Sequence, residues 1–192
     1  MTEIEYAVTR TPVGPVGVAW RGDVVVLAEM DVAASRTEWS TDYARGGPHA
    51  RMRERLSLRF ADVHLVRGAA GAAPLRALRR YFEGEVDALD SLETDPGGTA
   101  FQAAVWRELR RIPAGHTRTY GELAEGIGHP GAARATGGAV GANPIPLVIP
   151  CHRILGGDGK LTGFGGGIRR KHWLLSHEGA AFREPSRQLS FA

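Results

Sequence analysis

The only cysteine of this 192-residue chain lies in the run Ile149-Pro150-Cys151-His152-Arg153. A thiol attacks as its thiolate, which is sparsely populated near neutral pH unless a neighbouring base or positive charge assists it. His152 and Arg153 supply a candidate base and a candidate positive charge at the next two positions. A lone cysteine is more often a small buried hydrophobic side chain. Its surroundings must therefore decide whether Cys151 is a nucleophile.

A carboxylate near the end of the chain can complete a catalytic set. Glu178 falls at the C-terminal end of a helix expected from about Ile168, which Gly179 would end. The helix dipole disfavours an anion there unless a partner compensates it. If His152 is that partner, Glu178 orients the imidazole and the imidazole activates Cys151, as in a catalytic triad. The same three groups would also serve a thiol hydrolase that acts by acyl transfer.

The segments on either side of the cysteine suggest how it is held. Pro146–Pro150 predicts a short buried strand that ends at the thiol, and its prolines restrict the backbone. Thr162–Gly167 is rich in glycine and would leave backbone N–H groups open to a ligand. Glycine runs are more often plain loops, and a Walker-type phosphate loop is excluded because no Gly-Lys-Ser/Thr sequence follows. We expect a rigid mount for the thiol.

Three helices are expected ahead of the cysteine, over residues 99–112, 119–127 and 131–142. The first two begin with a threonine followed three residues later by glutamine or glutamate, which is the pattern of a capping box. The second and third are joined by a tight glycine-containing turn and form a helix-turn-helix pattern. Many helical hairpins in plain protein cores share this pattern, so alone it is a weak sign of DNA binding.

The third of these helices is made almost entirely of small residues: Ala132-Ala133-Arg134-Ala135-Thr136-Gly137-Gly138-Ala139. A helix that reads base edges in the major groove needs several Arg, Asn or Gln side chains on one face. Small residues instead let the backbone approach a packed neighbour, or a nucleic-acid groove that is bound without sequence reading. Arg134 then stands alone as a side chain able to take the stacking position of a displaced base.

The first half of the chain predicts a small antiparallel sheet. Side chains alternate over residues 4–8 and 16–18, around a turn at Pro12–Pro15, and the apolar run Val24–Leu27 follows. Further along, we expect a helix over Met52–Phe60.

The rest of this half ends in a linker. We expect a strand at Val63–Val66 and a helix over residues 75–82 with one apolar face. Thr94–Gly98 is the best linker, so a domain boundary is placed there.

Composition is that of an ordinary globular protein, with 43% hydrophobic and 23% charged residues. One cysteine cannot form an internal disulfide or a Cys-x-x-Cys zinc site, and the histidines are scattered, so no metal is expected. Neither a signal peptide nor a membrane span is evident, which favours a cytoplasmic protein. Residues 1–93 carry 12 basic and 14 acidic side chains (−2), and residues 94–192 carry 12 and 7 (+5). The second half is the candidate for an anionic partner, although an arginine-rich solvated surface fits equally well.

Several motifs of the second half resemble the O6-alkylguanine-DNA alkyltransferases, also called methylated-DNA–protein-cysteine methyltransferases. The resemblance covers about residues 94–179. Its motifs, in order, are Phe101-Gln102-x-x-Val105-Trp106, Ile112-Pro113-x-Gly115-x-Thr117-x-Thr119-Tyr120, Ala133-Arg134-Ala135, Asn143-Pro144 and Ile149-Pro150-Cys151-His152-Arg153.

This resemblance implies roles for the residues that match. Cys151 would accept the alkyl group irreversibly, with His152 as its base through a water molecule. Glu178 would orient His152, and Asn143 would tether the helix to the active-site segment. The residues implied to contact substrate or DNA are Tyr120, Ala133, Arg134, Ala135, Gly137, Pro146, Val148, Phe164 and Gly165.

The resemblance also implies an α+β fold and a partner. The fold would comprise an N-terminal α/β domain (1–93) with an antiparallel sheet of the ribonuclease H-like kind. A mostly helical C-terminal domain (94–179) with a winged helix-turn-helix and a tail (180–192) would follow. The partner would be double-stranded DNA carrying O6-alkylguanine, with O4-alkylthymine as a second candidate lesion. We expect no cofactor and no membrane, and a monomer for which cooperative assembly on DNA stays open.

The chain departs from the family pattern at two positions. Phe164 stands where tyrosine is usual, so ring packing is kept and a hydroxyl hydrogen bond is lost. Thr136 replaces the usual valine. Two alternatives to alkyl transfer are a non-catalytic protein that recognises alkylation damage, against which the retained Cys151 argues, and the thiol hydrolase named above.

Overall fold

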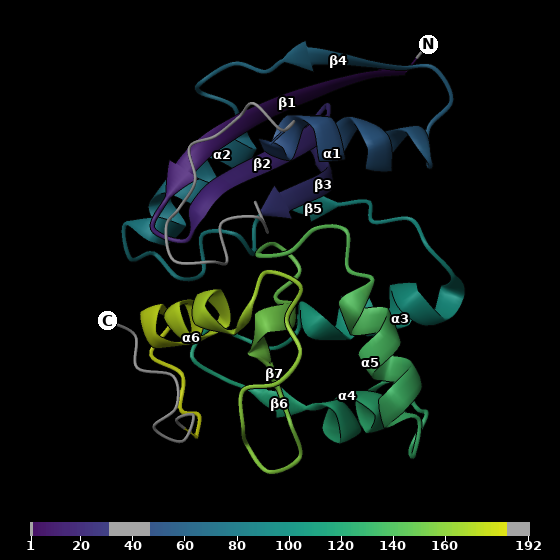
Figure 1. Cartoon of the computed structure of the whole chain (residues 1–192), viewed down its shortest axis with the longest axis vertical. Coiled ribbons are helices and arrows are strands. Elements are labelled where there is room, and N and C mark those ends of the chain that lie inside the picture. Colours follow the sequence, from purple (N-terminus) through teal and green to yellow (C-terminus); the bar gives the residue numbers. More distant parts are fainter. Residues whose placement is uncertain (1, 31–46, 184–192) are drawn as a thin grey trace.

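The computed structural model of the chain describes residues 2–30 and 47–183, and it forms two bodies that lie one above the other (Figure 1). We call them the sheet body (residues 2–30 and 47–94) and the helical body (residues 99–183). The described residues contain no helix long and apolar enough to cross a membrane. Part of the predicted tail, residues 184–192, lies outside the described residues.

The sheet body holds a five-stranded sheet of order β4-β1-β2-β3-β5. Its three central strands are antiparallel, as predicted, whereas β4 and β5 run parallel to β1 and β3 because helical connections bring the chain back in the same direction. The elements are β1 (Thr2–Thr11), β2 (Gly14–Arg21), β3 (Val24–Met30), α1 (Gly47–Ser57), β4 (Val63–Arg67), α2 (Ala73–Phe82) and β5 (Glu93–Thr94). The predicted strand at 63–66 and helix at 75–82 are confirmed, and the helix predicted over Met52–Phe60 begins and ends earlier.

The two helices of this body cover opposite faces of the sheet. Alternate side chains of a strand point to opposite faces, and on β2 the side chain of Ala19 packs in one apolar cluster with Leu56 of α1. Its neighbour Val18 packs in a second, larger cluster with Leu78 of α2. That larger cluster continues into the helical body, so the two bodies share one core.

The helical body begins with the two predicted capped helices. Both capping boxes are present, each threonine hydroxyl accepting from the backbone N–H three residues on. Two very short strands, β6 and β7, pair in parallel beside them. The elements are α3 (Ala100–Leu109), β6 (Arg118–Thr119), α4 (Tyr120–Gly126), α5 (Ala133–Gly141), a 3₁₀ turn (Cys151–Arg153), β7 (Ile154–Leu155) and α6 (Ile168–His177).

The predicted strand over Pro146–Pro150 is wrong: the segment is a tight turn. Ile149 donates its backbone N–H to the carbonyl of Ile145 at 2.8 Å, which reverses the chain, and Leu147 takes a positive φ of 74°. The prolines lack the N–H groups that a strand ladder requires. Asn143 closes the turn, donating to Ile149 O at 2.8 Å and accepting from Ile145 N at 3.0 Å.

Direct hydrogen bonds join the two bodies close to this turn. The backbone N–H of Ala28 on β3 donates to the carbonyl of Pro144 at 2.9 Å. The buried side chain of Arg170 on α6 donates to Val13 O in the β1–β2 turn at 2.7 Å and to Gly166 O at 3.0 Å. The sheet body is therefore fixed against the segment that carries the cysteine and against the glycine-rich loop.

Candidate active site

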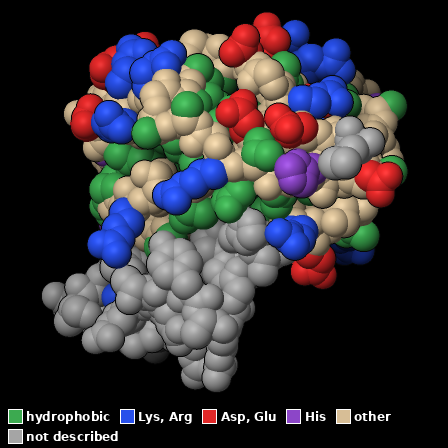
Figure 2. All heavy atoms as spheres, turned by 90° about the horizontal axis from the view of Figure 1, so that it is seen from above, with side chains coloured by type: hydrophobic (Ala, Val, Ile, Leu, Met, Phe, Trp, Pro, Cys, Tyr) green, Lys and Arg blue, Asp and Glu red, His purple; other side chains and the backbone are tan. Residues whose placement is uncertain are grey.

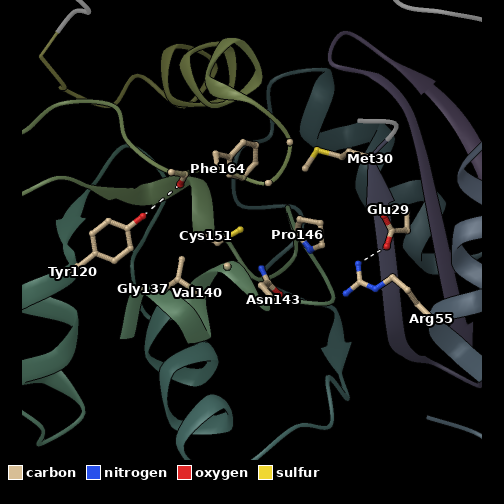
Figure 3. Close-up of a pocket in the computed structure, with 14 residues that line it drawn as sticks. Glu29, Met30, Arg55, Tyr120, Gly137, Val140, Asn143, Pro146, Cys151 and Phe164 are labelled. Carbon is tan, nitrogen blue, oxygen red and sulfur yellow. Dashed lines mark hydrogen bonds and ion pairs between the residues drawn. The ribbon is translucent and has the colours of Figure 1, made fainter. Parts of the chain in front are cut away.

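A cavity of about 480 Å³ reaches the cysteine where the two bodies meet (Figure 3). Several predicted site residues line it: Tyr120, Gly137, Asn143, Pro146, Cys151, Phe164 and Gly165. Further lining residues were not predicted: Glu29, Met30, Arg55, Val140, Gly141, Gly163 and Gly166. Three of these come from the sheet body, so the cavity is built by both halves of the chain.

Cys151 opens a 3₁₀ turn at the back of this cavity and is only 7% exposed. Burial raises the pKa of its thiol, and a hydrogen bond from Asn143 and the positive charge of Lys171 oppose that rise. Since the pKa is raised overall, the resting thiol is protonated near neutral pH. Attack by sulfur therefore needs a base that removes this proton.

His152 is fully buried behind the thiol, and its Nε2 lies 2.8 Å from Glu178 Oε1. Burial lowers the pKa of His152, against the opposing influence of Glu178, so the imidazole is neutral near pH 7. An ionised carboxylate only accepts hydrogen bonds, so the proton of the neutral ring lies on Nε2. Nδ1 then carries the lone pair, and it has no hydrogen-bond partner among the described residues. The ring is in the correct form to act as a base.

Glu178 caps the C-terminus of α6 and gathers four hydrogen bonds from three side chains. Besides His152, Tyr81 OH donates to Oε1 at 2.8 Å, and Arg153 donates through Nε to Oε2 and through Nη2 to Oε1, both at 2.9 Å. Burial alone would raise the pKa of Glu178, but the hydrogen bonds and charges of His152 and Arg153 lower it to about 2. These donors offset the unfavourable position of an anion at this helix end.

The sequence did not predict that Arg153 and Tyr81 would contact Glu178. The sequence indicates Arg153 only as a positive charge near the thiol, whereas its side chain is buried and also donates to Ile112 O at 2.6 Å. Tyr81 comes from α2 of the sheet body, where its helical spacing marked it only as a core residue. Its contact with Glu178 spans 97 positions in the sequence, and no local pattern signals such a contact.

Lys171 is a fully buried cation that sequence reasoning also missed. Its ammonium group donates to the carbonyls of Ile154 and Thr162, the latter at 2.6 Å, which joins the glycine-rich loop to β7. Burial lowers its pKa to about 8, and the nearby Cys151 acts in the opposite direction. The side chain both holds the loop and places positive charge near the sulfur.

The glycine-rich loop forms the roof of the cavity. Tyr120 OH donates to Gly163 O at 3.4 Å, and the ring of Phe164 lies edge-on to His152 with 6.4 Å between centroids. A Cβ on Gly166 would come within 2.7 Å of the Phe164 ring and 2.9 Å of the Met30 side chain. Glycine at that position therefore leaves room for both side chains.

Helix α5 presents its small-residue face beside the cavity. Arg134 is exposed, and Gly137 lies where a Cβ would touch the Tyr120 ring at 3.6 Å. The remaining predicted contact residues do not line the cavity: Ala133, Arg134, Ala135 and the buried Val148. Within the described ranges, no group of three or more His, Cys, Asp and Glu side chains is placed to hold a metal ion.

A thiol backed by a buried histidine–glutamate pair opens into a cavity beside two helices joined by a short turn. This combination defines a class of proteins in which a buried cysteine, backed by a histidine–glutamate pair, lies beside a pair of short helices. Residues 100–180 match the family model described as 6-O-methylguanine DNA methyltransferase, DNA binding domain.

Curated relatives and solved structures agree with that match. The methylated-DNA–protein-cysteine methyltransferase of Mycobacterium tuberculosis is 42% identical over 178 residues, covering 91% of this chain and 92% of that protein. The Shigella flexneri protein of the same name is 56% identical over 102 residues, and the match spans 53% of this chain and 60% of that relative's length. The crystal structure of Mycobacterium tuberculosis OGT in complex with DNA superposes with a TM-score of 0.70 at 38% identity, covering 91% of this chain and 92% of that one. The chain belongs to the methylated-DNA–protein-cysteine methyltransferase family.

Proposed function

We propose that this protein repairs DNA by moving an alkyl group from O6 of guanine to Sγ of Cys151, once per molecule. The observation that carries this proposal is the placement of Cys151 in the wall of a cavity of about 480 Å³, with His152 and Glu178 buried behind it. A cavity of that size suits a single base. The names of the relatives reported above support the same reaction.

The proposed transfer balances without a cofactor. The thiol of Cys151 gives up its proton towards Nδ1 of His152 through a water molecule, while Glu178 holds the ring by Nε2. The bond from Sγ to the alkyl carbon forms as the bond from that carbon to O6 breaks. The electron pair stays on the guanine, which takes up a proton in exchange for the one lost by the thiol. The thioether is stable, so the protein acts once.

The substrate must leave the duplex before it can meet a buried sulfur. Extruding a nucleotide costs a few kcal/mol, and Arg134, which is exposed on α5, would fill the gap. Ala133, Ala135 and Gly137 would let the helix backbone approach the minor groove. Pro146, Phe164 and Tyr120 would pack around the base, with backbone groups of Val148 and Gly165 as its hydrogen-bond partners. Asn143 would hold the turn that presents the thiol.

We assign residues 1–93 to a ribonuclease H-like domain, which the mixed sheet flanked by helices supports. Residues 94–179 would be the DNA-binding and acceptor domain, with β6 and β7 beside a winged helix-turn-helix. The protein would act in the cytoplasm as a monomer on duplex DNA carrying O6-alkylguanine, with O4-alkylthymine as a second lesion.

Intact-mass spectrometry tests the proposal directly. The protein is mixed with a duplex that carries one O6-methylguanine, and peptides are then mapped. We expect a gain of one methyl group per protein, located on the peptide that contains Cys151, and no gain in Cys151→Ser. The serine variant should still bind the duplex, because the contact surface on α5 is unchanged.

Two other results would replace the proposal. An unchanged mass together with tight, lesion-selective binding would identify a recognition protein without transfer. Turnover beyond one equivalent on an ester substrate would identify a thiol hydrolase.

A further inference from the structure

Strand β1 has an edge without a partner strand among the described residues. Strand β4 pairs in parallel with only the first half of β1, residues 2–6. Gly68 then donates its N–H to Tyr6 O at 2.9 Å, and the chain turns away towards α2. Residues 7–11 continue the pairing with β2 on the other side. No strand from residues 2–30 or 47–183 takes the position that β4 would occupy next to them.

The hydrogen-bonding groups on this edge can be identified from the strand geometry. The carbonyl of Tyr6 faces β4, because it accepts from Gly68. Backbone groups of alternate residues face the same side of a strand, so the N–H and C=O of Val8 and Arg10 point to the open edge. None of these four groups takes part in a backbone hydrogen bond between described residues outside the sheet. Ala7 and Thr9 face β2 instead.

A groove lies along this edge, with a volume of about 550 Å³. One wall is apolar and belongs to α2, where Leu78 is 2% exposed and Leu75 and Phe82 are half-buried. The full lining is Ala7, Val8, Thr9, Arg10, Thr11, Pro12, Arg67, Gly68, Ala70, Leu75, Leu78, Arg79, Phe82 and Glu83. The groove is separate from the cavity at the cysteine, since the two share no lining residue.

Positive charge surrounds this groove. Arg10 and Arg67 stand at the two ends of the open stretch, and Arg79 lies on the α2 wall. By strand alternation, Arg10 and Arg67 share the face of the sheet that carries Ile4 and α1. Glu83 is the one acidic residue of the lining, although residues 1–93 have a net charge of −2. A strand added in this groove would therefore face Arg10 and Arg67 with one side and the apolar wall of α2 with the other. Acidic side chains suit the first side, and apolar side chains suit the second.

We propose that this groove binds an extended segment of a partner protein, which adds a strand beside residues 7–11 of β1. The segment alternates apolar side chains, which pack on α2, with acidic side chains, which face Arg10 and Arg67. Backbone groups of Val8 and Arg10 supply the hydrogen bonds, and the side-chain pockets supply the selectivity, as in other cases of strand addition. Double-stranded DNA fits less well, since it offers no apolar side chains for Leu75 and Phe82.

Amide hydrogen exchange measured by NMR on the full chain tests this proposal. The probe is a short peptide that alternates valine with glutamate, and its counterpart alternates valine with lysine. We expect the glutamate peptide to slow exchange of the Val8 and Arg10 amides by about tenfold or more, as for a hydrogen bond that protects an open edge. The amides of Ala7 and Thr9 should not change, because β2 already protects them. Equal binding of the lysine peptide, or no protection at Val8 and Arg10, would overturn the proposal.

Charge reversal separates a peptide groove from a DNA surface. The double variant Arg10→Glu with Arg67→Glu should weaken binding of the glutamate peptide about tenfold, equivalent to ~1.4 kcal/mol. Arg53→Glu, an exposed arginine on α1 outside the groove, is the matched control and should change it less than about twofold. Slow exchange at Ala7 and Thr9 reports that the double variant is folded. If the double variant instead keeps peptide affinity and loses affinity for undamaged duplex, the arginines serve DNA and the proposal fails.

Discussion

The helical body and the sheet body contribute to the site in different ways. The helical body supplies Cys151, His152, Glu178 and the glycine-rich loop above the cavity, and the half of the chain that contains it has a net charge of +5. The half that contains the sheet body has a net charge of −2, and acidic and basic side chains are interspersed over the face seen in Figure 2. The sheet body contributes three lining residues of the cavity, Glu29, Met30 and Arg55, and supports the site through a few buried contacts.

Those contacts join residues that are distant in sequence. Tyr81 reaches Glu178 across 97 positions, and Arg170 reaches Val13 across 157. Residues of the proposed chemistry are closer in sequence: Asn143, Cys151 and His152 lie within ten positions, and Glu178 follows His152 by 26 positions. The residues of the proposed chemistry therefore come from the helical body, whereas the rigidity of the site depends on both halves of the chain. Substitutions at the contacts between the bodies can test this division.

The largest effect is expected from Glu178→Gln, at the point where both bodies meet. The variant leaves the buried guanidinium of Arg153 without its counter-charge, which typically costs about 3–5 kcal/mol of unfolding free energy. It also removes the anion that orients His152, so transfer should slow at least tenfold. Urea unfolding and single-turnover transfer measure the two effects. Glu125→Gln, an exposed glutamate on α4, is the control. Equal stability of both variants would contradict the central role of the carboxylate.

Acid should remove much of the same stabilisation in the unmodified protein. The pKa of Glu178 is lowered from 4.5 to about 2 in the folded state, so its ionisation stabilises the fold by ~3 kcal/mol above pH 4.5. That contribution is lost progressively as the pH falls from about 4.5 towards 2. The stability gap between the unmodified protein and Glu178→Gln should therefore narrow over this range in urea titrations. A gap that stays constant down to pH 3 would show that the charge of Glu178 does not provide the stabilisation.

A smaller effect is expected when only the contribution of the sheet body is removed. Tyr81→Phe deletes a buried hydroxyl that donates to Glu178, at a cost of about 1.5 kcal/mol. Since the hydroxyl stabilises the carboxylate, its loss should also move the acid transition to higher pH. Transfer should slow severalfold while affinity for undamaged DNA is unchanged, because Tyr81 is fully buried. Loss of DNA affinity would show that Tyr81 stabilises more of the helical body than the carboxylate of Glu178.

The difference between local patterns and contacts across the two bodies explains how far the sequence could predict the structure. The capping boxes of α3 and α4 are local hydrogen-bond patterns, and both were confirmed. Prediction failed at Pro146–Pro150, where apolar residues suggested a strand but Asn143 closes a turn. The lining contributed by Met30 and Arg55 was missed because it depends on how the two bodies pack. Contacts between distant parts of the chain have no local sequence signal. The resemblance therefore indicated the residues of the proposed chemistry, but not the residues that hold them in position.

The smallest effect is expected within the helical body alone, at Thr136. This side chain is fully buried in α5, and its hydroxyl has no hydrogen-bond partner among the described residues. Valine has nearly the same shape, so Thr136→Val removes the cost of burying an unpaired hydroxyl and should raise the unfolding free energy by about 1 kcal/mol. Transfer should be unchanged, because Thr136 does not line the cavity.

The same substitution at Thr119 provides a control with the opposite sign. The hydroxyl of Thr119 caps α4 by accepting from Glu122 N at 3.2 Å, so Thr119→Val should cost about 1 kcal/mol. Urea unfolding of the two variants side by side measures both changes. A gain at Thr136 with unaltered transfer would mean that stability within the helical body can change without affecting the chemistry. A loss of stability in both variants would show that the Thr136 hydroxyl has a hydrogen-bond partner. In that case α5 would be held by a buried polar contact within the helical body as well as by apolar packing.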